Sequence, residues 1–207
     1  MLDEFISPVF CGASATLNVA GFILYFHRLS KGKAACFTGW FLSFVIATAA
    51  AVSHFSLTGN LAQSGSYFVG AIFCGLICLF SLKGGLAVGR PEVTSILVAL
   101  AVGIFVFLSP RYSVYGIAIY NLLLYSVFLR NIQQGNPEQV MPWLIWIGAA
   151  LSQLAALLLS AAQQITLLLP IVNLICWSSV AVLAIRNNNH TCCINLFHLL
   201  PGRKENA

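Results

Sequence analysis

The sequence predicts an all-α integral membrane protein with seven transmembrane helices, arranged as two parallel three-helix repeats joined by a linker helix. Three observations predict this fold: the apolar composition, the spacing of the apolar segments and the placement of the basic residues. Charged residues make up only 7% of the chain and the apolar classes 59%, whereas soluble domains carry about 25% charged residues. Such a chain cannot cover a water-exposed surface with charge, so we expect a lipid bilayer around it.

Seven apolar segments are candidate transmembrane helices, because about 18 or more apolar residues cross the hydrocarbon core. The fourth segment is the shortest, although flanking Val and Leu residues extend it. The last two are separated only by "AAQQ", which predicts a tight hairpin; one fused, kinked element, and hence six spans, is the alternative. The predicted spans are 6–27, 36–57, 65–82, 93–108, 112–129, 143–161 and 164–185.

The basic residues predict the orientation. With seven spans, one side holds the loops after the first, third and fifth helices and the C-terminus, while the other side carries only Arg111. Because Lys and Arg concentrate on the cytoplasmic side, we expect the N-terminus outside and the C-terminus in the cytoplasm. This asymmetry accounts for the net positive charge, so no nucleic-acid partner is predicted. The residues on the basic side are Arg28, Lys31, Lys33, Lys83, Arg90, Arg130, Arg186, Arg203 and Lys204.

Overlaying the chain on itself predicts an internal repeat, because rare residue types coincide at matched positions. An offset of 103 residues superposes the first three spans on the last three without a gap, and it pairs Asn18 with Asn121, Gly32 with Gly135, Trp40 with Trp143, and Lys83 with Arg186. Both units would start in the same direction, as in transporters with parallel repeats, whose substrate site lies at the repeat interface near midplane. The predicted division is 1–91 for the first repeat, 92–109 for the linker helix, 110–187 for the second repeat and 188–207 for a cytoplasmic tail.

Two segments carry a resemblance to a known family. Tyr115–Arg130, "YGIAIYNLLLYSVFLR", looks like the Asn- and aromatic-bearing first helix of a unit in the SWEET and PQ-loop superfamily. Glu138–Trp177, which contains "WLIW", resembles the penultimate hairpin of the PnuC-type vitamin transporters, although the Pro-Gln dipeptide of PQ-loop proteins is absent. The resemblance implies a facilitator of a B-vitamin precursor such as nicotinamide riboside, in a bacterial inner (plasma) membrane. A SWEET-type sugar facilitator, and a non-transporting seven-helix receptor or assembly subunit, are the alternatives.

Four amide side chains inside predicted spans are candidate substrate contacts. Asn18 and Asn121 are related by the repeat, Gln153 lies in the middle of the sixth span and Asn173 in the middle of the seventh. An amide in lipid is costly unless it is paired, so each should face the helix bundle. If the four converge, they form a neutral site rich in donors and acceptors, suited to a ribose or a carboxamide.

Three further candidate contacts are Trp146, Tyr120 and His54. Trp143 and Trp146 lie about 300° apart around a helix; we expect Trp143, like Trp40, to be an anchor in the aromatic belt at the membrane surface. Trp146 lies nearly a turn deeper, where its indole N–H needs a partner, so we expect it to stack on a ligand. Tyr120 suits a flat heterocycle. His54 is a gate, a ligand contact or a neutral histidine bonding a neighbouring helix.

The spans lack the groups that other functional classes need. They contain no Asp, Glu, Lys or Arg, and coupled carriers typically have intramembrane carboxylates; we therefore expect facilitated diffusion and not a carboxylate-ring channel. No nucleophile–base pair or metal-ligand cluster lies inside them, so neither an enzyme, a metal nor a cofactor is expected. The expected partners are a small-molecule solute and the bilayer. The oligomeric state, a homo-oligomer included, and palmitoylation of Cys192 and Cys193 are left open.

Overall fold

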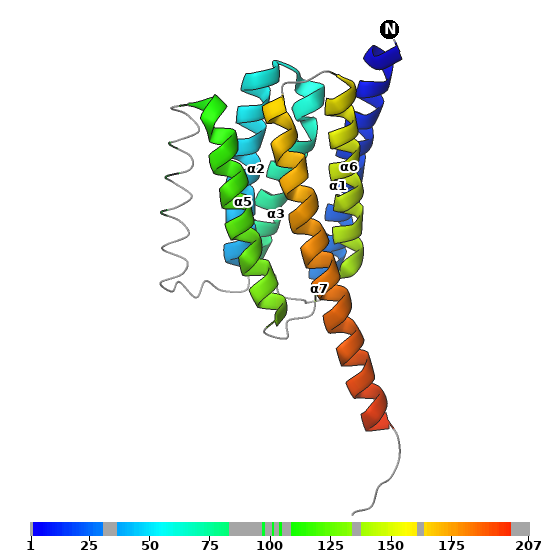
Figure 1. Cartoon of the computed structure of the whole chain (residues 1–207). Coiled ribbons are helices and arrows are strands. Elements are labelled where there is room, and N and C mark those ends of the chain that lie inside the picture. The colour runs from blue at the N-terminus through cyan, green and yellow to red at the C-terminus, as the bar shows by residue number, and fades with distance from the viewer. Residues whose placement is uncertain are drawn as a thin grey trace, which may run out of the picture.

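Six apolar helices long enough to cross a membrane form the described part of the computed structural model (Figure 1). The structure describes residues 2–30, 37–82, 109–133, 138–160 and 164–199, together with positions 97, 101 and 104. These residues contain helices and turns and no strand, which confirms the all-α class and supports a multi-pass membrane protein. The helices are α1 (Leu2–Ser30), α2 (Phe37–Thr58), α3 (Leu61–Leu82), α5 (Pro110–Gln133), α6 (Val140–Leu159) and α7 (Leu168–Leu199), with a short 3-10 helix, η1 (Gln164–Leu167), before α7.

The described helices match six of the seven predicted spans. The predicted linker helix, 92–109, lies outside the described residues except at positions 97, 101, 104 and 109. The alternative that fuses the last two spans is wrong, because α6 and α7 are separate elements with η1 between them. α7 also continues to Leu199, so the predicted tail begins as a prolongation of this helix, although its side chains after Asn188 lie outside the described set.

The turn between α2 and α3 shows why α3 begins four residues before its predicted start. Gly59 has a φ of +61°, a left-handed conformation that glycine adopts without steric cost and that commonly ends helices. The Oδ1 atom of Asn60 accepts hydrogen bonds from the backbone N–H groups of Ala62 (2.9 Å) and Gln63 (3.2 Å). These are the bonds of an N-cap, so a two-residue turn ends one helix and starts the next.

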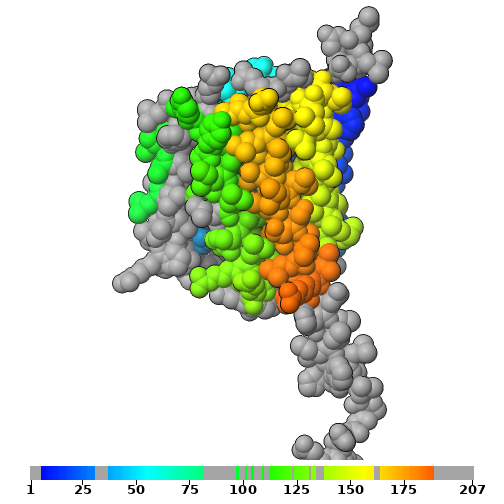
Figure 2. All heavy atoms as spheres, in the orientation of Figure 1, coloured from blue at the N-terminus to red at the C-terminus, as the bar shows by residue number. Residues whose placement is uncertain are grey.

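The six helices form two layers of three (Figure 1). In the first layer α3 lies between α1 and α2, and in the second layer α7 lies between α5 and α6. The layers meet at both edges, where α1 packs along α6 and α2 packs along α5. Figure 2 shows the second layer face-on, with α5, α7 and α6 side by side. Exposed residues of α6 and α7 include Leu144, Leu151, Leu158, Ile171, Ile175 and Val182, as expected of a surface that faces lipid.

Serine side chains connect the two layers at both edges. At the α1–α6 edge, the hydroxyl groups of Ser7 and Ser14 donate hydrogen bonds to the backbone carbonyls of Ala156 (3.1 Å) and Ala149 (2.9 Å). At the other edge, the hydroxyl groups of Ser53 and Ser113 lie 2.6 Å apart. Small residues allow membrane helices to approach closely, and serine adds a hydrogen bond across the contact. The layers are therefore joined at their edges, which leaves room between them at the centre.

Candidate functional site

A cavity lies between the two layers, and all six described helices contribute to its wall. Centres of water molecules can occupy about 90 Å³ of it, several times the roughly 10–15 Å³ that one water requires. The cavity can therefore hold a small solute. Its wall is mainly apolar and, among the described residues, includes no charged side chain. The polar side chains in the wall are Asn18, Ser43, Ser66, Tyr67, Asn121, Tyr125, Gln153 and Asn173, together with four tryptophans, Trp40, Trp143, Trp146 and Trp177.

Five of the seven predicted contacts line this cavity: Asn18, Asn121, Trp146, Gln153 and Asn173. The four amides, which belong to four different helices, thus converge on one space. The remaining two predicted contacts lie outside the wall.

His54 and Tyr120, the two predicted contacts that do not line the cavity, are both buried in the protein. The Nδ1 atom of His54 lies 3.1 Å from the Ser64 hydroxyl, and its ring packs against Tyr67 with 5.1 Å between centroids. His54 thus bonds a neighbouring helix, which was one of its three predicted roles. Sequence position alone could not place either side chain relative to the cavity.

The amides are paired in equivalent ways within the two layers. Asn18 of α1 donates a hydrogen bond to Ser66 of α3, and Asn121 of α5 donates one to Asn173 of α7. Gln153 of α6 instead donates to the backbone carbonyl of Gln63 in α3 at 2.7 Å. Each bond uses part of the capacity of a side-chain amide, which has two donor hydrogens and two acceptor lone pairs. The amides are therefore held in position while they line the cavity.

The predicted belt role of Trp143 and Trp40 is wrong. Both residues line the cavity, with exposed fractions of 1% and 3%. Their indole N–H groups find partners inside the protein: Trp143 donates to the Glu138 carboxylate at 3.4 Å, and Trp40 donates to the Tyr25 hydroxyl at 3.1 Å. A belt residue would turn this group toward the lipid headgroups. The prediction failed because Glu138 and Tyr25 supply hydrogen-bond acceptors inside the protein, so neither indole needs a headgroup partner.

Trp146 is at the centre of an aromatic cluster at one end of the cavity. Its indole N–H donates to the backbone carbonyl of Asn18 at 3.4 Å, and its ring packs against Gly21, where an added Cβ atom would lie 2.4 Å from Nε1. Only glycine leaves space for the indole here. We call this the aromatic end of the cavity; it comprises Phe22, Tyr25, Trp40, Trp143, Trp146 and Trp177, with ring centroids 5.0–6.3 Å from that of Trp146.

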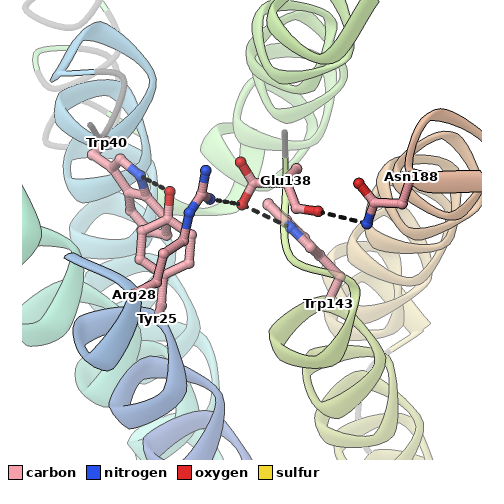
Figure 3. A network of polar contacts seen from close by, with 6 residues as sticks. All are labelled: Tyr25, Arg28, Trp40, Glu138, Trp143 and Asn188. Atoms are coloured by element: carbon pink, nitrogen blue, oxygen red, sulfur yellow. Dashed lines mark hydrogen bonds and ion pairs between the residues drawn. The ribbon is translucent and has the colours of Figure 1, made fainter. Parts of the chain in front are cut away.

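A buried ion pair, which was not predicted from the sequence, lies beyond the aromatic end (Figure 3). Arg28 of α1 and Glu138, which precedes α6, are 2.6 Å apart, and both are 6% exposed. The guanidinium group also lies over the Tyr25 ring at 5.4 Å. Asn188 of α7 donates to the backbone carbonyl of Glu138 at 3.3 Å. This network therefore connects the first layer to the second.

Burial dominates the electrostatics of Glu138. It raises the pKa of the carboxyl above its ordinary value of 4.5, although Arg28 and the hydrogen bond from Trp143 act in the opposite direction. The carboxylate also lies near the N-terminus of α6, where the helix dipole favours negative charge. Arg28 and Glu138 fell outside the predicted spans and are 110 positions apart. The sequence around Trp143 did not indicate that a carboxylate would accept the hydrogen bond of its indole N–H.

The opposite end of the cavity is polar and incompletely hydrogen-bonded. Gln153 lies roughly 20 Å farther along α6 than the first residue of that helix. Three buried side-chain atoms here have no hydrogen-bond partner among the described residues: Nε2 of His54, the hydroxyl of Tyr67 and Oε1 of Gln153. Tyr67 and Gln153 line the cavity directly. We call these three residues the polar end.

Comparisons of the chain with protein-family models, with curated proteins and with solved structures found no match. Within the described ranges, no group of three or more His, Cys, Asp or Glu side chains could hold a metal ion. The side chains of the cavity wall offer hydrogen bonds from amides, serine hydroxyls and phenols, and indole rings for stacking.

Proposed function

We propose that the protein is a membrane transporter that facilitates the diffusion of a small neutral or nucleoside-like solute. The observation that carries this proposal is the cavity between the two helix layers, whose described wall carries no charge and includes amides and indoles from both layers. Ligand sites are typically apolar cavities with a few convergent polar groups. A cavity at the interface of two bundles also suits alternating access, in which one bundle rocks against the other around the site.

Helix boundaries support two parallel repeats. Adding 103 to the residue number of a helix end or start in the first layer gives the corresponding helix end or start in the second layer. The packing repeats as well: α3 lies against α1 and α2 as α7 lies against α5 and α6, and the α1–α6 contact corresponds to the α5–α2 contact. The matched boundaries are Ser30 with Gln133, Phe37 with Val140, and Leu61 with Gln164.

Chain direction supports a seventh span and the 3+1+3 arrangement. α3 ends at the lower end of the six-helix bundle in Figure 1, whereas α5 begins at its upper end. A linker helix within 92–109 would connect them and would let α1 and α5 run in the same direction. Arg28 and Arg130 lie in the last turns of α1 and α5, and Arg186 lies in the second half of α7. With the positive-inside rule, this supports a C-terminus in the cytoplasm.

The aromatic end supplies a closed gate in this mechanism. The Arg28–Glu138 pair joins α1 to the segment before α6, and therefore links the two bundles. For the cavity to open on this side, the ion pair must separate and the rings around Trp146 must part. The solute would be released when this end opens, and the polar end would open when the aromatic end is closed.

A nucleoside-like vitamin precursor such as nicotinamide riboside is the substrate that we favour. Trp146 offers a face for a planar ring, and the amides of Asn18, Asn121 and Asn173 offer donors and acceptors for ribose hydroxyls. A sugar would use the same amides without needing the indole ring. A receptor or assembly subunit, which need not release its ligand across the bilayer, is the alternative of a different class.

The proposal is tested with the purified protein in liposomes. Uptake and binding of nicotinamide riboside, thiamine, riboflavin and simple sugars would be measured for the native protein and for Trp146→Ala and Asn173→Ala. We expect saturable uptake of one compound, with binding weakened about tenfold or more when either contact is removed. Phe55→Ala, which alters an exposed ring on α2, is the control. Binding without uptake of any compound would favour the receptor, and neither binding nor uptake would contradict the proposal.

A further inference from the structure

The unpaired polar atoms at the polar end indicate which solute groups the cavity binds. This inference rests on the proposed transport function. Buried polar atoms in native proteins nearly always have hydrogen-bond partners, so unpartnered ones require an explanation. Two such atoms, the Tyr67 hydroxyl and Oε1 of Gln153, belong to residues of the cavity wall. They come from α3 and α6, which belong to different layers. A solute between the layers would therefore lie against both residues.

The orientation of the Gln153 amide is fixed by its other hydrogen bond. The backbone carbonyl of Gln63 can only accept, so the group that bonds it at 2.7 Å must be the amide nitrogen of Gln153. The unpartnered atom is consequently the carbonyl oxygen, an obligate acceptor. A solute group that satisfies Gln153 must donate a hydrogen bond.

Tyr67 supplies the complementary atom. Its hydroxyl can donate to a solute acceptor, and the phenol is held by the ring of His54, whose centroid lies 5.1 Å away. His54 is itself fixed by Ser64, three residues before Tyr67 on α3. The polar end thus holds one fixed acceptor and one donor, both on residues of the cavity wall.

We propose that the polar end selects solutes carrying a neutral group that both donates and accepts a hydrogen bond, with a primary carboxamide the best fit, and rejects the corresponding carboxylate. A carboxamide can donate through nitrogen to Gln153 and accept through oxygen from Tyr67. A carboxylate has no hydrogen to donate, so Gln153 stays unpaired. Its charge would also enter a wall that offers no cationic side chain among the described residues, and burying an unpaired charge is costly.

The experiment compares two matched pairs of probes that differ only in this group: nicotinamide with nicotinic acid, and benzamide with benzoate. Binding to the full-length purified protein would be measured by calorimetry at pH 7. We expect each amide to bind at least tenfold more tightly than its acid, since a site built for a hydrogen bond discriminates strongly against an analogue that cannot make it. Equal affinity within both pairs would overturn the inference.

Two variants separate recognition from folding. Tyr67→Phe removes only the hydroxyl, and we expect it to weaken amide binding about tenfold; Tyr120→Phe, a buried tyrosine outside the cavity wall, should leave it unchanged. Unchanged amide binding in Tyr67→Phe would mean that ordered water alone satisfies this hydroxyl, and the inference would be wrong. Liposome uptake without discrimination between amide and acid would contradict this inference and leave the transport proposal standing. Discrimination in binding without uptake would contradict transport alone.

Discussion

The two ends of the cavity differ in how completely their polar groups are bonded. At the aromatic end, the indole N–H groups of Trp40, Trp143 and Trp146 all have acceptors, and Glu138 is paired with Arg28. At the polar end, Tyr67 and Gln153 each keep a buried polar atom without a partner among the described residues. Satisfied bonds hold a structure in place, whereas unsatisfied ones cost free energy that a ligand can recover. The contrast fits the roles that we propose, in which the aromatic end closes the cavity and the polar end recognises the solute.

The largest expected effect comes from separating the charges at the aromatic end. Arg28→Met leaves the buried Glu138 carboxylate without its cation, and we expect a loss of about 3–5 kcal/mol in the free energy of unfolding. Adding Glu138→Leu removes the unpaired charge, so the double variant should recover part of that loss. Denaturant titration in detergent measures both. A double variant that is less stable than Arg28→Met would contradict the assignment of a buried ion pair.

The next effect tests the packing of Trp146. Gly21→Ala places a methyl group 2.4–2.9 Å from three indole atoms, and overpacking of this kind typically costs about 1–3 kcal/mol. We expect lower thermal stability together with weaker solute binding, because the rigid ring must shift into the cavity. Gly12→Ala is the matched control on the same helix, since nothing lies within 4 Å of the added carbon. Equal effects of the two substitutions would show that Gly21 is not a packing constraint.

Two tyrosine substitutions compare the ends directly. Tyr25→Phe removes the acceptor of the Trp40 N–H at the aromatic end, and leaving a buried donor unpaired costs about 1–3 kcal/mol. Tyr67→Phe removes a hydroxyl that has no partner in the described part of the chain, so stability should be unchanged or slightly higher. Thermal unfolding of both variants in the absence of solute gives the comparison. A larger loss in Tyr67→Phe would reverse the roles that we assign to the two ends.

The smallest expected effect is a dependence on pH. Because burial raises the pKa of Glu138 above 4.5, the folded protein binds this proton at a higher pH than the unfolded chain does. The resulting stabilisation is fully present below pH 4.5 and is lost as the pH rises through the raised pKa. We therefore expect the native protein to lose thermal stability relative to Glu138→Gln between pH 4.5 and neutrality. The opposite slope would mean that the ion pair outweighs the burial of the carboxyl.

The sequence predicted the helices better than it predicted their contacts. Six of the predicted spans follow from apolar length alone, and the amides Asn18, Asn121, Gln153 and Asn173 were expected at the bundle interior because lipid penalises an unpaired amide. All four amides line the same cavity in the structure. The Gly59–Asn60 turn could also have been recognised from its residues, which would have set the start of α3 correctly.

The aromatic end could not have been predicted in the same way. The apolar periodicity of a helix is the same whether a tryptophan near its end faces lipid headgroups or a buried carboxylate. What distinguishes the two cases for Trp143 is Arg28, which neutralises Glu138 from 110 positions away in the chain. The pairs Gly32–Gly135 and Lys83–Arg186, on which the repeat was partly based, involve residues outside the described ranges. Only packing between the layers decides which of the two environments a ring meets.

All four tryptophans of the chain line the cavity. The intrinsic indole emission of the protein therefore originates entirely from the wall of the space where we place the solute. No added fluorophore is needed to follow occupancy, because a solute that stacks on Trp146 changes the surroundings of that emitter, and Trp40, Trp143 and Trp177 lie in the same wall. The tryptophans therefore serve as intrinsic fluorescent probes of the cavity. Rapid-mixing fluorescence would follow entry of the solute separately from opening of the aromatic end.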